Sequence, residues 1–597
     1  MTSTKTTPTT PTTASPTTAS PATAPPAPSS LPRRTVLATG AAGAAAAGVL
    51  GSGVRPAQAD PTGQPGQAGA AERAKAKHEV FQHGVASGDP LPRRVVIWTR
   101  VTPTPAATAG SGKGGPVTVT WQVAKDKRFR KVVSKGRFLT SAGRDHTVKL
   151  DAKGLKPDTE YFYRFRALGQ KSPVGRLRTA PRKRAALDNL RFGVVSCANL
   201  EAGFFSSYRG LAARDDLHAV LHLGDYLYEY PTGGYGMGQG NVVVRPHDPP
   251  HEMVSLEDYR RRHANYKADP DLQALHARYS WILTWDDHEV TNDQWKSGAE
   301  NHDESEGDYK VRRARAHRAY DEWMPVRMDG TAALGDGTRL YRRLRFGQLA
   351  EVSMLDLRTY RDEQAALPGV DPTVSDPSRS ITGKKQMAWL KESLTRGDHA
   401  PQWKVIGNPV MIAPVTFGDL PNDLIDPIND VTGILPGDGA PYNVDQWDGY
   451  TADRREVLGH IRDHQVKDVL FITGDIHSGW ACELPLDTST QPLYGDSYGV
   501  EFVCSSVTSN NLKDITGVPQ LTPIVETAIL ANNRHIKYLD FDNHGYSVLD
   551  ITPARAQMDW YVIGARDDAA TPIEWSTSYA TQAGTGRITP VDAPLEA

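Results

Sequence analysis

Six side chains that can bind a metal lie at or near the ends of five apolar runs in this chain. The runs are LRFGVVSC (190–197), LHAVLHLGD (217–225), SWILTWDDHE (280–289), WKVIGNPV (403–410) and VLFITGDIH (469–477). Each run has the composition of a buried strand. The side chains are Cys197, Asp225, Asp287, Asn408, Asp475 and His477. Because functional groups of open α/β sheets gather beyond the carboxyl ends of the strands, we expect these six to meet in one hydrolytic metal centre.

Each of these residues also has a purely structural explanation. A Gly-Asp pair after a strand, as at Asp225, is usually a turn, and Asn408 precedes a proline, where asparagine is a common turn former. His477 alone could be a hydrogen-bonded core side chain. Asp475, however, projects to the same side of an extended segment as His477. The run 286–289 (DDHE) places four ionisable groups after an apolar run, where unpaired burial is very costly. A metal removes most of that cost, which favours the metal site.

Residues 80–181 show the pattern of a β domain. Runs such as RVVIWTRV (94–101), VTVTWQVA (117–124) and TEYFYRFRAL (159–168) alternate apolar and polar residues, with turn residues between them. The segment LKPDTEYFY (155–163) resembles the corner of a fibronectin-type sandwich. We therefore expect a small fibronectin-like β-sandwich domain, joined to the next domain by the basic linker at 182–184.

Residues 190–565 alternate strand and helix patterns. Helices are predicted at 256–266, 308–323, 384–394 and 453–464. This rhythm predicts an α/β catalytic domain in which β-sheets are flanked by helices. The glycine-rich stretch at 232–240 lacks the Lys-Ser/Thr ending of a nucleotide-binding loop, so we interpret it as a flexible loop near the site. Residues 566–597 are expected to form a C-terminal tail.

Composition limits the class of protein. The chain has 597 residues, 39% hydrophobic and 23% charged, with a formal net charge of −1. These values allow a substantial hydrophobic core. The chain has no excess of basic residues, so its composition does not predict a specific nucleic-acid partner. Three cysteines are too few for a disulfide scaffold. Cys482 and Cys504 lie on predicted strands and could pair, and the sequence leaves that open.

The N-terminal 59 residues have the features of an export signal. Residues 1–30 are almost entirely Thr, Pro, Ala and Ser, a composition that predicts disorder. Arg33 and Arg34 then precede an uncharged stretch rich in Ala and Gly, which resembles a twin-arginine signal with cleavage near Ala59. The alternative is a transmembrane anchor, for which the stretch is only weakly apolar. We expect export by the twin-arginine machinery, a secreted protein with no permanent membrane anchor, and a linker at 60–79.

The strand-end residues resemble the ligand motifs of the calcineurin-like metallophosphoesterases. Their purple acid phosphatase branch carries GDxxY, GNH, a strand-end His and GHxH. This chain has Gly224-Asp225-x-x-Tyr228, Asp287-His288, Asn408 and Gly474-Asp475-x-His477. That variant set resembles the PhoD-type alkaline phosphatases, which include phospholipase D-like members. Further similar motifs are GVASGDP (84–90), LYR (340–342), LDLRTYR (355–361) and HGY (544–546).

The resemblance implies a ligand set and a mechanism. Fe³⁺ would be held by Cys197, Asp225, Tyr228 and His477. Ca²⁺ would be held by Asp225, Asp287, Asn408 and Asp475, and oxygen ligands of this kind suit a hard cation. A metal-activated hydroxide would attack the phosphorus, and His288 would protonate the leaving group or stabilise the transition state.

Three functions follow as expectations. The first is a secreted alkaline phosphatase acting on phosphate monoesters and some diesters, and the second is phospholipase D-type cleavage of phospholipid head groups. The third is a non-catalytic, metal-stabilised binding protein. Arg358 and Arg361 would either bind substrate phosphate or form internal ion pairs.

Overall fold

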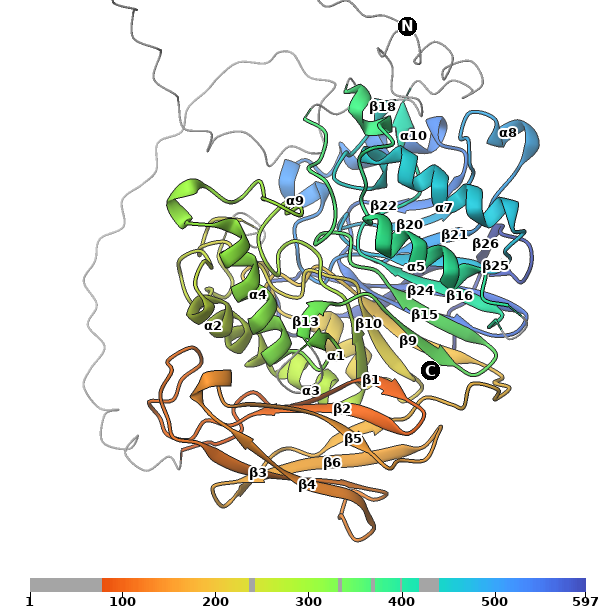
Figure 1. The fold of residues 1–597 in the computed structure, drawn as a ribbon. Coiled ribbons are helices and arrows are strands. Elements are labelled where there is room, and N and C mark those ends of the chain that lie inside the picture. The colour runs from red at the N-terminus through yellow and green to blue at the C-terminus, as the bar shows by residue number, and fades with distance from the viewer. Residues whose placement is uncertain are drawn as a thin grey trace, which may run out of the picture. The chain divides into compact units, whose positions relative to one another are not determined.

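The computed structural model of the protein describes residues 78–235, 242–330, 336–366, 371–397, 400–417 and 440–596. The predicted signal, nearly all of the predicted linker and part of the glycine-rich stretch lie outside these residues. Two mixed β-sheets with flanking helices make up most of the regular secondary structure of the described residues, which confirms the predicted α/β class (Figure 1).

The larger sheet has ten strands and contributes three of the five predicted strand ends. Its order is β26-β25-β24-β23-β9-β10-β11-β1-β2-β5. The bounds are β26 Ile588–Val591, β25 Ile573–Gln582, β24 Arg555–Ile563, β23 Gly545–Ile551, β9 Leu190–Val195, β10 Ala219–His222, β11 Ser280–Leu283, β1 Val85–Leu91, β2 Arg94–Arg100 and β5 Thr147–Lys153. Strands β9, β10, β11 and β1 are parallel neighbours, so their carboxyl ends lie at the same edge.

The second sheet has seven strands in the order β14-β15-β16-β19-β21-β20-β22. The bounds are β14 Arg342–Phe346, β15 Ala350–Met354, β16 Trp403–Asn408, β19 Val469–Thr473, β21 Val500–Val503, β20 Gly479–Glu483 and β22 Ile536–Asp540. Its four central strands, β15, β16, β19 and β21, run parallel to one another. The five predicted strand runs therefore all form strands, but they are divided between two sheets.

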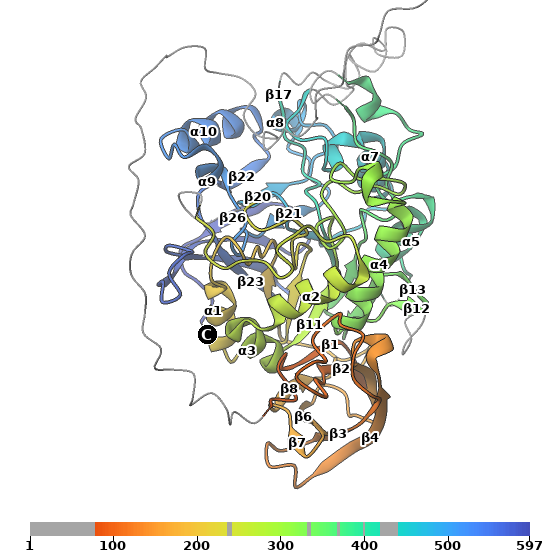
Figure 2. The ribbon, with the colours of Figure 1, turned by 90° about the vertical axis from the view of Figure 1, so that its left-hand side faces the viewer.

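The two sheets share a buried core. Val194 and Leu221 of the larger sheet belong to the same buried cluster as Val352, Val405 and Leu470 of the smaller one. The larger sheet is covered on its other face by helices, whose buried side chains form a second cluster with β10 and β11. Helices and sheets are thus stacked in layers, and the strand ends of both sheets open at one side (Figure 2).

The four helices predicted from the sequence are confirmed. They are α2 Leu256–Lys267, α4 Tyr309–Trp323, α5 Lys384–Leu394 and α7 Thr451–Asp463. Ser255 and Asp258 form a capping box at the start of α2, and Asp308 caps α4. The helices that sequence reasoning missed are α1 Ser206–Ala213, α3 Pro270–Arg278, α8 Gln491–Tyr494, α9 Leu512–Thr516 and α10 Thr522–Asn532. Most are short, so their sequences carry too few turns for a clear period.

A separate fibronectin-like sandwich is not confirmed. Strands β3 Val117–Ala124, β4 Val132–Thr140, β6 Glu160–Ala167, β7 Gln170–Lys171 and β8 Gly175–Arg178 do form a five-stranded sheet. The layer packed against them, β1, β2 and β5, belongs instead to the ten-stranded sheet. Gly88 on β1 permits this pairing with β11, because a Cβ there would lie 2.0 Å from the Pro325 carbonyl oxygen and 2.9 Å from that of Trp281.

The prediction of a C-terminal tail at 566–597 was wrong, because two strands lie in this segment. Residues 573–582 and 588–591 are strands β25 and β26, which extend the larger sheet beyond β24. The burial of β25 does not alternate regularly, because exposed residues gather in its first half and buried ones in its second half, so the sequence carried no clear strand pattern.

The structure also bears on a possible disulfide bond and on membrane-spanning helices. The three cysteines are free and buried, so Cys482 and Cys504 are not paired. Among the described residues, no helix is both long and apolar enough to cross a membrane. The apolar stretch that follows Arg34 lies outside those residues.

Deleting residues 567–597 should lower the melting temperature and promote aggregation. The deletion removes β25 and β26 and leaves the edge of β24 unpaired. A deletion of 592–597 alone keeps both strands and is the matched control. Calorimetry and light scattering would show the difference, and equal melting temperatures for the two deletions would contradict this role of the C-terminal strands.

Candidate metal centre

The predicted ligands lie at or near the ends of strands of both sheets. Cys197, Asp225 and Asp287 follow β9, β10 and β11 of the larger sheet, within two to four residues of each strand end. Asn408 is the last residue of β16 and pairs in register with Thr473, the last residue of β19. Parallel pairing places these carboxyl ends together, as the sequence predicted.

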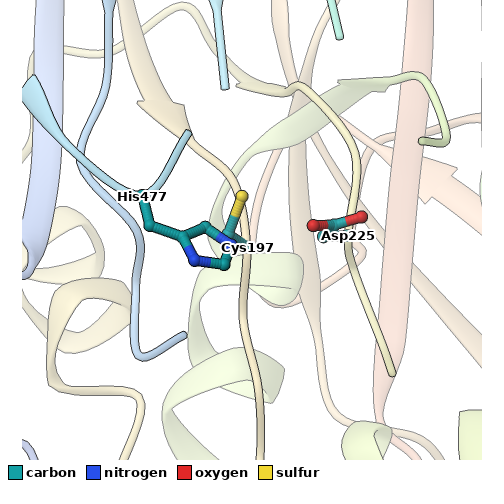
Figure 3. Close-up of side chains that lie close together, drawn as sticks. All are labelled: Cys197, Asp225 and His477. Carbon is teal, nitrogen blue, oxygen red and sulfur yellow. The ribbon is translucent and has the colours of Figure 1, made fainter. Parts of the chain in front are cut away.

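Two groups of side chains that could hold a metal have one residue in common, Asp225. Potential ligand atoms of Cys197, Asp225 and His477 all lie within 4.8 Å of one another, and Figure 3 shows these three side chains lying close together. The same criterion joins Asp225, Asp287 and His288. Asp225 belongs to both groups, which is the geometry required of a carboxylate that bridges two metals.

Tyr228 joins the first group. Its Oη donates to Asp225 Oδ2 at 3.0 Å and lies 3.3 Å from His477 Nε2. His477 Nδ1 lies 2.7 Å from the carbonyl oxygen of Asn510, so this nitrogen carries the proton and Nε2 keeps its lone pair toward Tyr228. Burial lowers the pKa of His477 to about 4, so the neutral imidazole can act as a ligand.

Two buried carboxylate oxygens in the cluster are without a hydrogen-bond partner. They are Oδ1 of Asp225 and Oδ1 of Asp287. Burial raises the pKa of Asp225 well above its ordinary value, and the neighbouring Asp287 raises it further. Unpaired buried oxygens of this kind are costly unless a cation binds them. The residues present therefore fit a metal site.

Asp475 and Asn408 approach from the smaller sheet. Asp475 Oδ1 lies 3.4 Å from an Arg358 nitrogen, and its Oδ2 accepts from Gln446 Nε2 at 3.2 Å. The Asn408 Oδ1 accepts from Trp447 Nε1 at 3.1 Å, and a carbonyl oxygen has a second lone pair available for a ligand. Asp475 and His477 are half-buried whereas Asp225 and Asp287 are buried, so the cluster opens to solvent at the 475–477 segment.

Four of the predicted ligand residues have a strained backbone. Their φ angles lie in the left-handed region that non-glycine residues seldom adopt: 57° at Cys197, 55° at Asp225, 66° at Asp475 and 54° at His477. Such residues cost on the order of 1–3 kcal/mol each and persist where the surrounding structure forces them. The four strained residues turn their side chains into the cluster, and this signal could not be read from the sequence.

Glu289 and Gly224 allow the turns at Asp225 and Asp286 to lie close together. Glu289 accepts from the backbone N–H groups of Asp225, Tyr226 and Asp286 at 3.2, 2.7 and 2.9 Å. Gly224 has φ of +115°, and a Cβ there would lie 2.5 Å from Asp286 Cβ. Only glycine fits this approach of the two turns.

His288 is fixed by a buried acid that sequence reasoning missed. Its Nδ1 lies 2.7 Å from Glu229 Oε2, and Glu229 also accepts from Asn292 N and Asn301 Nδ2. Burial lowers the pKa of His288, but the carboxylates of Asp287 and Glu229 outweigh burial and hold that pKa well above its usual value. Its ring centroid lies 4.1 Å from that of Tyr228.

The alternatives for Arg358 and Arg361 are decided in favour of internal ion pairs. Arg358 is fully buried, and its guanidinium contacts Asp286 at 2.5 Å and Asp445 at 2.8 Å. Arg361 is also buried and lies 2.7 Å from Asp445. The two arginines neutralise acids behind the cluster and leave Asp225 and Asp287 without a full counter-charge.

Ser509 is a further residue that no sequence motif identified. Its Oγ lies 2.6 Å from Tyr228 Oη and 2.9 Å from the carbonyl oxygen of Cys197. The segment that carries Ser509 and Asn510 is held by Arg566, which donates to Thr508 O and Asn510 Oδ1. The signal is spatial, because these residues lie more than 280 positions from Tyr228.

One strand-end carboxylate, Asp225, shared between two groups of ligand-type side chains on two stacked sheets is the arrangement that the resemblance to the PhoD-type phosphatases implied. Residues 192–560 match the sequence model of a family described as PhoD-like phosphatase, and residues 66–181 match that of its N-terminal domain. The chain therefore belongs to the PhoD-like phosphatase family and is a phosphoric ester hydrolase, as the resemblance implied.

Two relatives are similar over most of their length. The chain is 35% identical over 505 residues to alkaline phosphatase D of Bacillus subtilis (strain 168), covering 84% of this chain and 81% of the relative. A solved structure of PhoD aligns with a TM-score of 0.75 at 34% identity, covering 86% of this chain and 93% of that one.

Gly224→Ala should remove activity and destabilise the protein by about 1–3 kcal/mol, because alanine can neither adopt this φ without strain nor fit against Asp286. The matched control is Gly459→Ala in α7, where a Cβ meets nothing within 4 Å. That change should stabilise the helix by about 0.5–1 kcal/mol and leave turnover unchanged. Chemical denaturation and phosphatase assays would measure both, and an active, stable Gly224→Ala protein would refute the close approach of the turns.

Proposed function

We propose that this protein is an alkaline phosphatase that hydrolyses phosphate monoesters and some diesters with Fe³⁺ and Ca²⁺. The observation that carries the proposal is Asp225, which belongs to both ligand groups and keeps one buried oxygen without a partner. Family membership supports hydrolysis of phosphoric esters, so the non-catalytic binding protein is not retained. Parallel assays on a monoester, a diester and phosphatidylcholine test the substrate class, and a preference for phosphatidylcholine would favour the phospholipase reaction.

The donor types support this choice of metals. Cys197, Tyr228 and His477 supply thiolate, phenolate and imidazole around Asp225, a set that suits Fe³⁺. The second set consists of oxygen donors and suits Ca²⁺: Asp225, Asp287, Asn408 and Asp475. Bound metals would supply Lewis acidity toward the phosphoryl oxygens and lower the pKa of water.

The remaining chemistry belongs to the chain's own side chains. Glu229 accepts from His288 Nδ1, which leaves His288 Nε2 as the atom able to give a proton to the departing alcohol. That nitrogen lies 4.0 Å from Asp287 Oδ1, so the imidazole stands beside the second ligand group. The half-buried 475–477 segment provides the open side for substrate entry.

We also propose that the protein is secreted by the twin-arginine machinery and cleaved near Ala59. The support is Arg33 and Arg34 before a weakly apolar stretch, followed by the small residues Ala57 and Ala59. Export in the folded state suits a protein whose ligands come from two separate sheets, because the site exists only after folding.

Tyr228→Phe should remove a visible absorption band from the iron-loaded protein. The band arises from charge transfer between a phenolate and Fe³⁺, and the phenylalanine variant has no phenolate. The matched control is Tyr226→Phe, because Tyr226 Oη faces His276 instead, at 2.9 Å. Absorption spectra of samples with equal iron content would test this. A band that survives Tyr228→Phe, or an iron-loaded wild type without colour, would contradict the assignment.

His288→Ala should lower turnover by roughly 10²–10⁴ while the metal content is kept, which is the usual contribution of general acid–base catalysis. The loss should shrink for nitrophenyl esters, whose leaving groups need no proton. The control is His464→Ala, an exposed histidine after α7. Metal analysis and a leaving-group series would decide the role. An equal loss for all leaving groups, together with lost metal, would make His288 a ligand instead.

A further inference from the structure

A cavity lined by charged side chains lies outside the metal centre. It has a volume of about 530 Å³, within the usual range for small-ligand sites, and shares no lining residue with the proposed ligands. Its walls are the β1–β2 turn, Lys183 of the linker, the edge strand β14 with the residues before it, and α5 with Arg396 beyond its end. The cavity is therefore formed where the N-terminal strands contact the edge of the smaller sheet.

Basic side chains dominate this cavity. Its lining contains two acids, Asp89 and Glu351, and seven basic residues: Lys183, Arg327, Arg339, Arg342, Arg343, Arg345 and Arg396. Asp89 is already paired, because Arg342 donates to its two carboxylate oxygens through two nitrogens at 2.6 and 2.7 Å. Arg327 is paired with Asp151 at 2.6 Å.

Two of the other arginines lie farther from an acidic group. Arg343 and Arg396 share one carboxylate, Glu392, at 3.7 and 3.8 Å. Arg345 lies 4.0 Å from Glu351. Burial lowers the pKa of Arg343, and the nearby charge of Arg396 lowers it further, which shows that like charges are crowded here. An anion that entered the cavity would relieve this repulsion.

Two of the arginines follow one another along β14. Arg343 and Arg345 alternate with buried Leu344 on β14, so they project to the same face of the strand, roughly 7 Å apart. The Arg343 guanidinium lies over the Trp389 ring, 5.2 Å from its centroid, which fixes its plane. Planar guanidinium groups held in a row suit successive phosphate groups, which accept hydrogen bonds in pairs.

We propose that this cavity is a second, non-catalytic site that binds a linear ligand carrying several phosphate groups. The ligand class is a chain of phosphodiesters or phosphoanhydrides, which present the same repeated anionic oxygens. The site would hold part of such a chain against the edge strand, apart from the metal centre.

Fluorescence anisotropy of a labelled phosphorothioate oligothymidylate, which resists hydrolysis, tests the site on the metal-loaded protein. The double variant Arg343→Gln, Arg396→Gln should bind on the order of tenfold more weakly. The slope of log affinity against log salt should fall by about 1.4, since each phosphate contact contributes about 0.7 for a single strand. Lys183→Ala, in the exposed linker, should weaken binding in the same direction without disturbing the fold.

The matched control is Arg128→Ala, Arg130→Ala, which removes two exposed charges before β4. It should bind like the wild type, and every variant should keep wild-type turnover of a small monoester. Inorganic tripolyphosphate should displace the probe far better than orthophosphate does. If tripolyphosphate displaces the probe less well than unlabelled oligothymidylate does, the site is assigned to phosphodiesters. Equal affinity and salt slope in the cavity and control variants, or equal displacement by orthophosphate, would overturn the proposal. A failure of the metal assignment would leave this binding result unchanged.

Discussion

A buried excess of negative charge is the constraint on which the rest of this structure depends. Seven acids lie at or directly behind the strand ends: Asp225, Glu229, Asp286, Asp287, Glu289, Asp445 and Asp475. The nearby cations are Arg358, Arg361 and His288, which bind mainly Asp286, Asp445 and Glu229. Asp225 and Asp287 keep buried oxygens without a hydrogen-bond partner, an arrangement that a bound cation would stabilise.

The fold is arranged to hold that charge in place. Four residues at the site adopt left-handed backbone conformations, which are stabilised by the contacts around them. Glu289 ties the Asp225 and Asp286 turns together, while Ser509 and the Asn510 carbonyl orient Tyr228 and His477. These supports come from distant segments and from both sheets, so the geometry of the site depends on the whole catalytic domain rather than on one loop.

The sequence predicted the strands and the ligand-type side chains at their ends, but not the groups that support those side chains. Apolar runs ending on Asp225 or His477 carry a local signal, because burial and ligand type can be read from adjacent residues. The partners of those ligands, such as Glu229 and Ser509, are set by tertiary packing and leave no local pattern. The N-terminal strands were assigned to a separate sandwich for the same reason: the β1–β11 pairing joins residues nearly two hundred positions apart. Strand β25 lacked regular alternation, so it was mistaken for a tail.

The most direct test of this account is metal analysis of the wild type and of Asp225→Asn, with phosphatase activity measured on the same samples. Asp225 is the one carboxylate common to both ligand groups, so its replacement should remove iron and calcium together and abolish turnover. Circular dichroism on each sample would confirm that the variant is folded. A wild-type protein that is fully active without metal, or a folded Asp225→Asn variant that retains both metals and normal turnover, would contradict the bridging role.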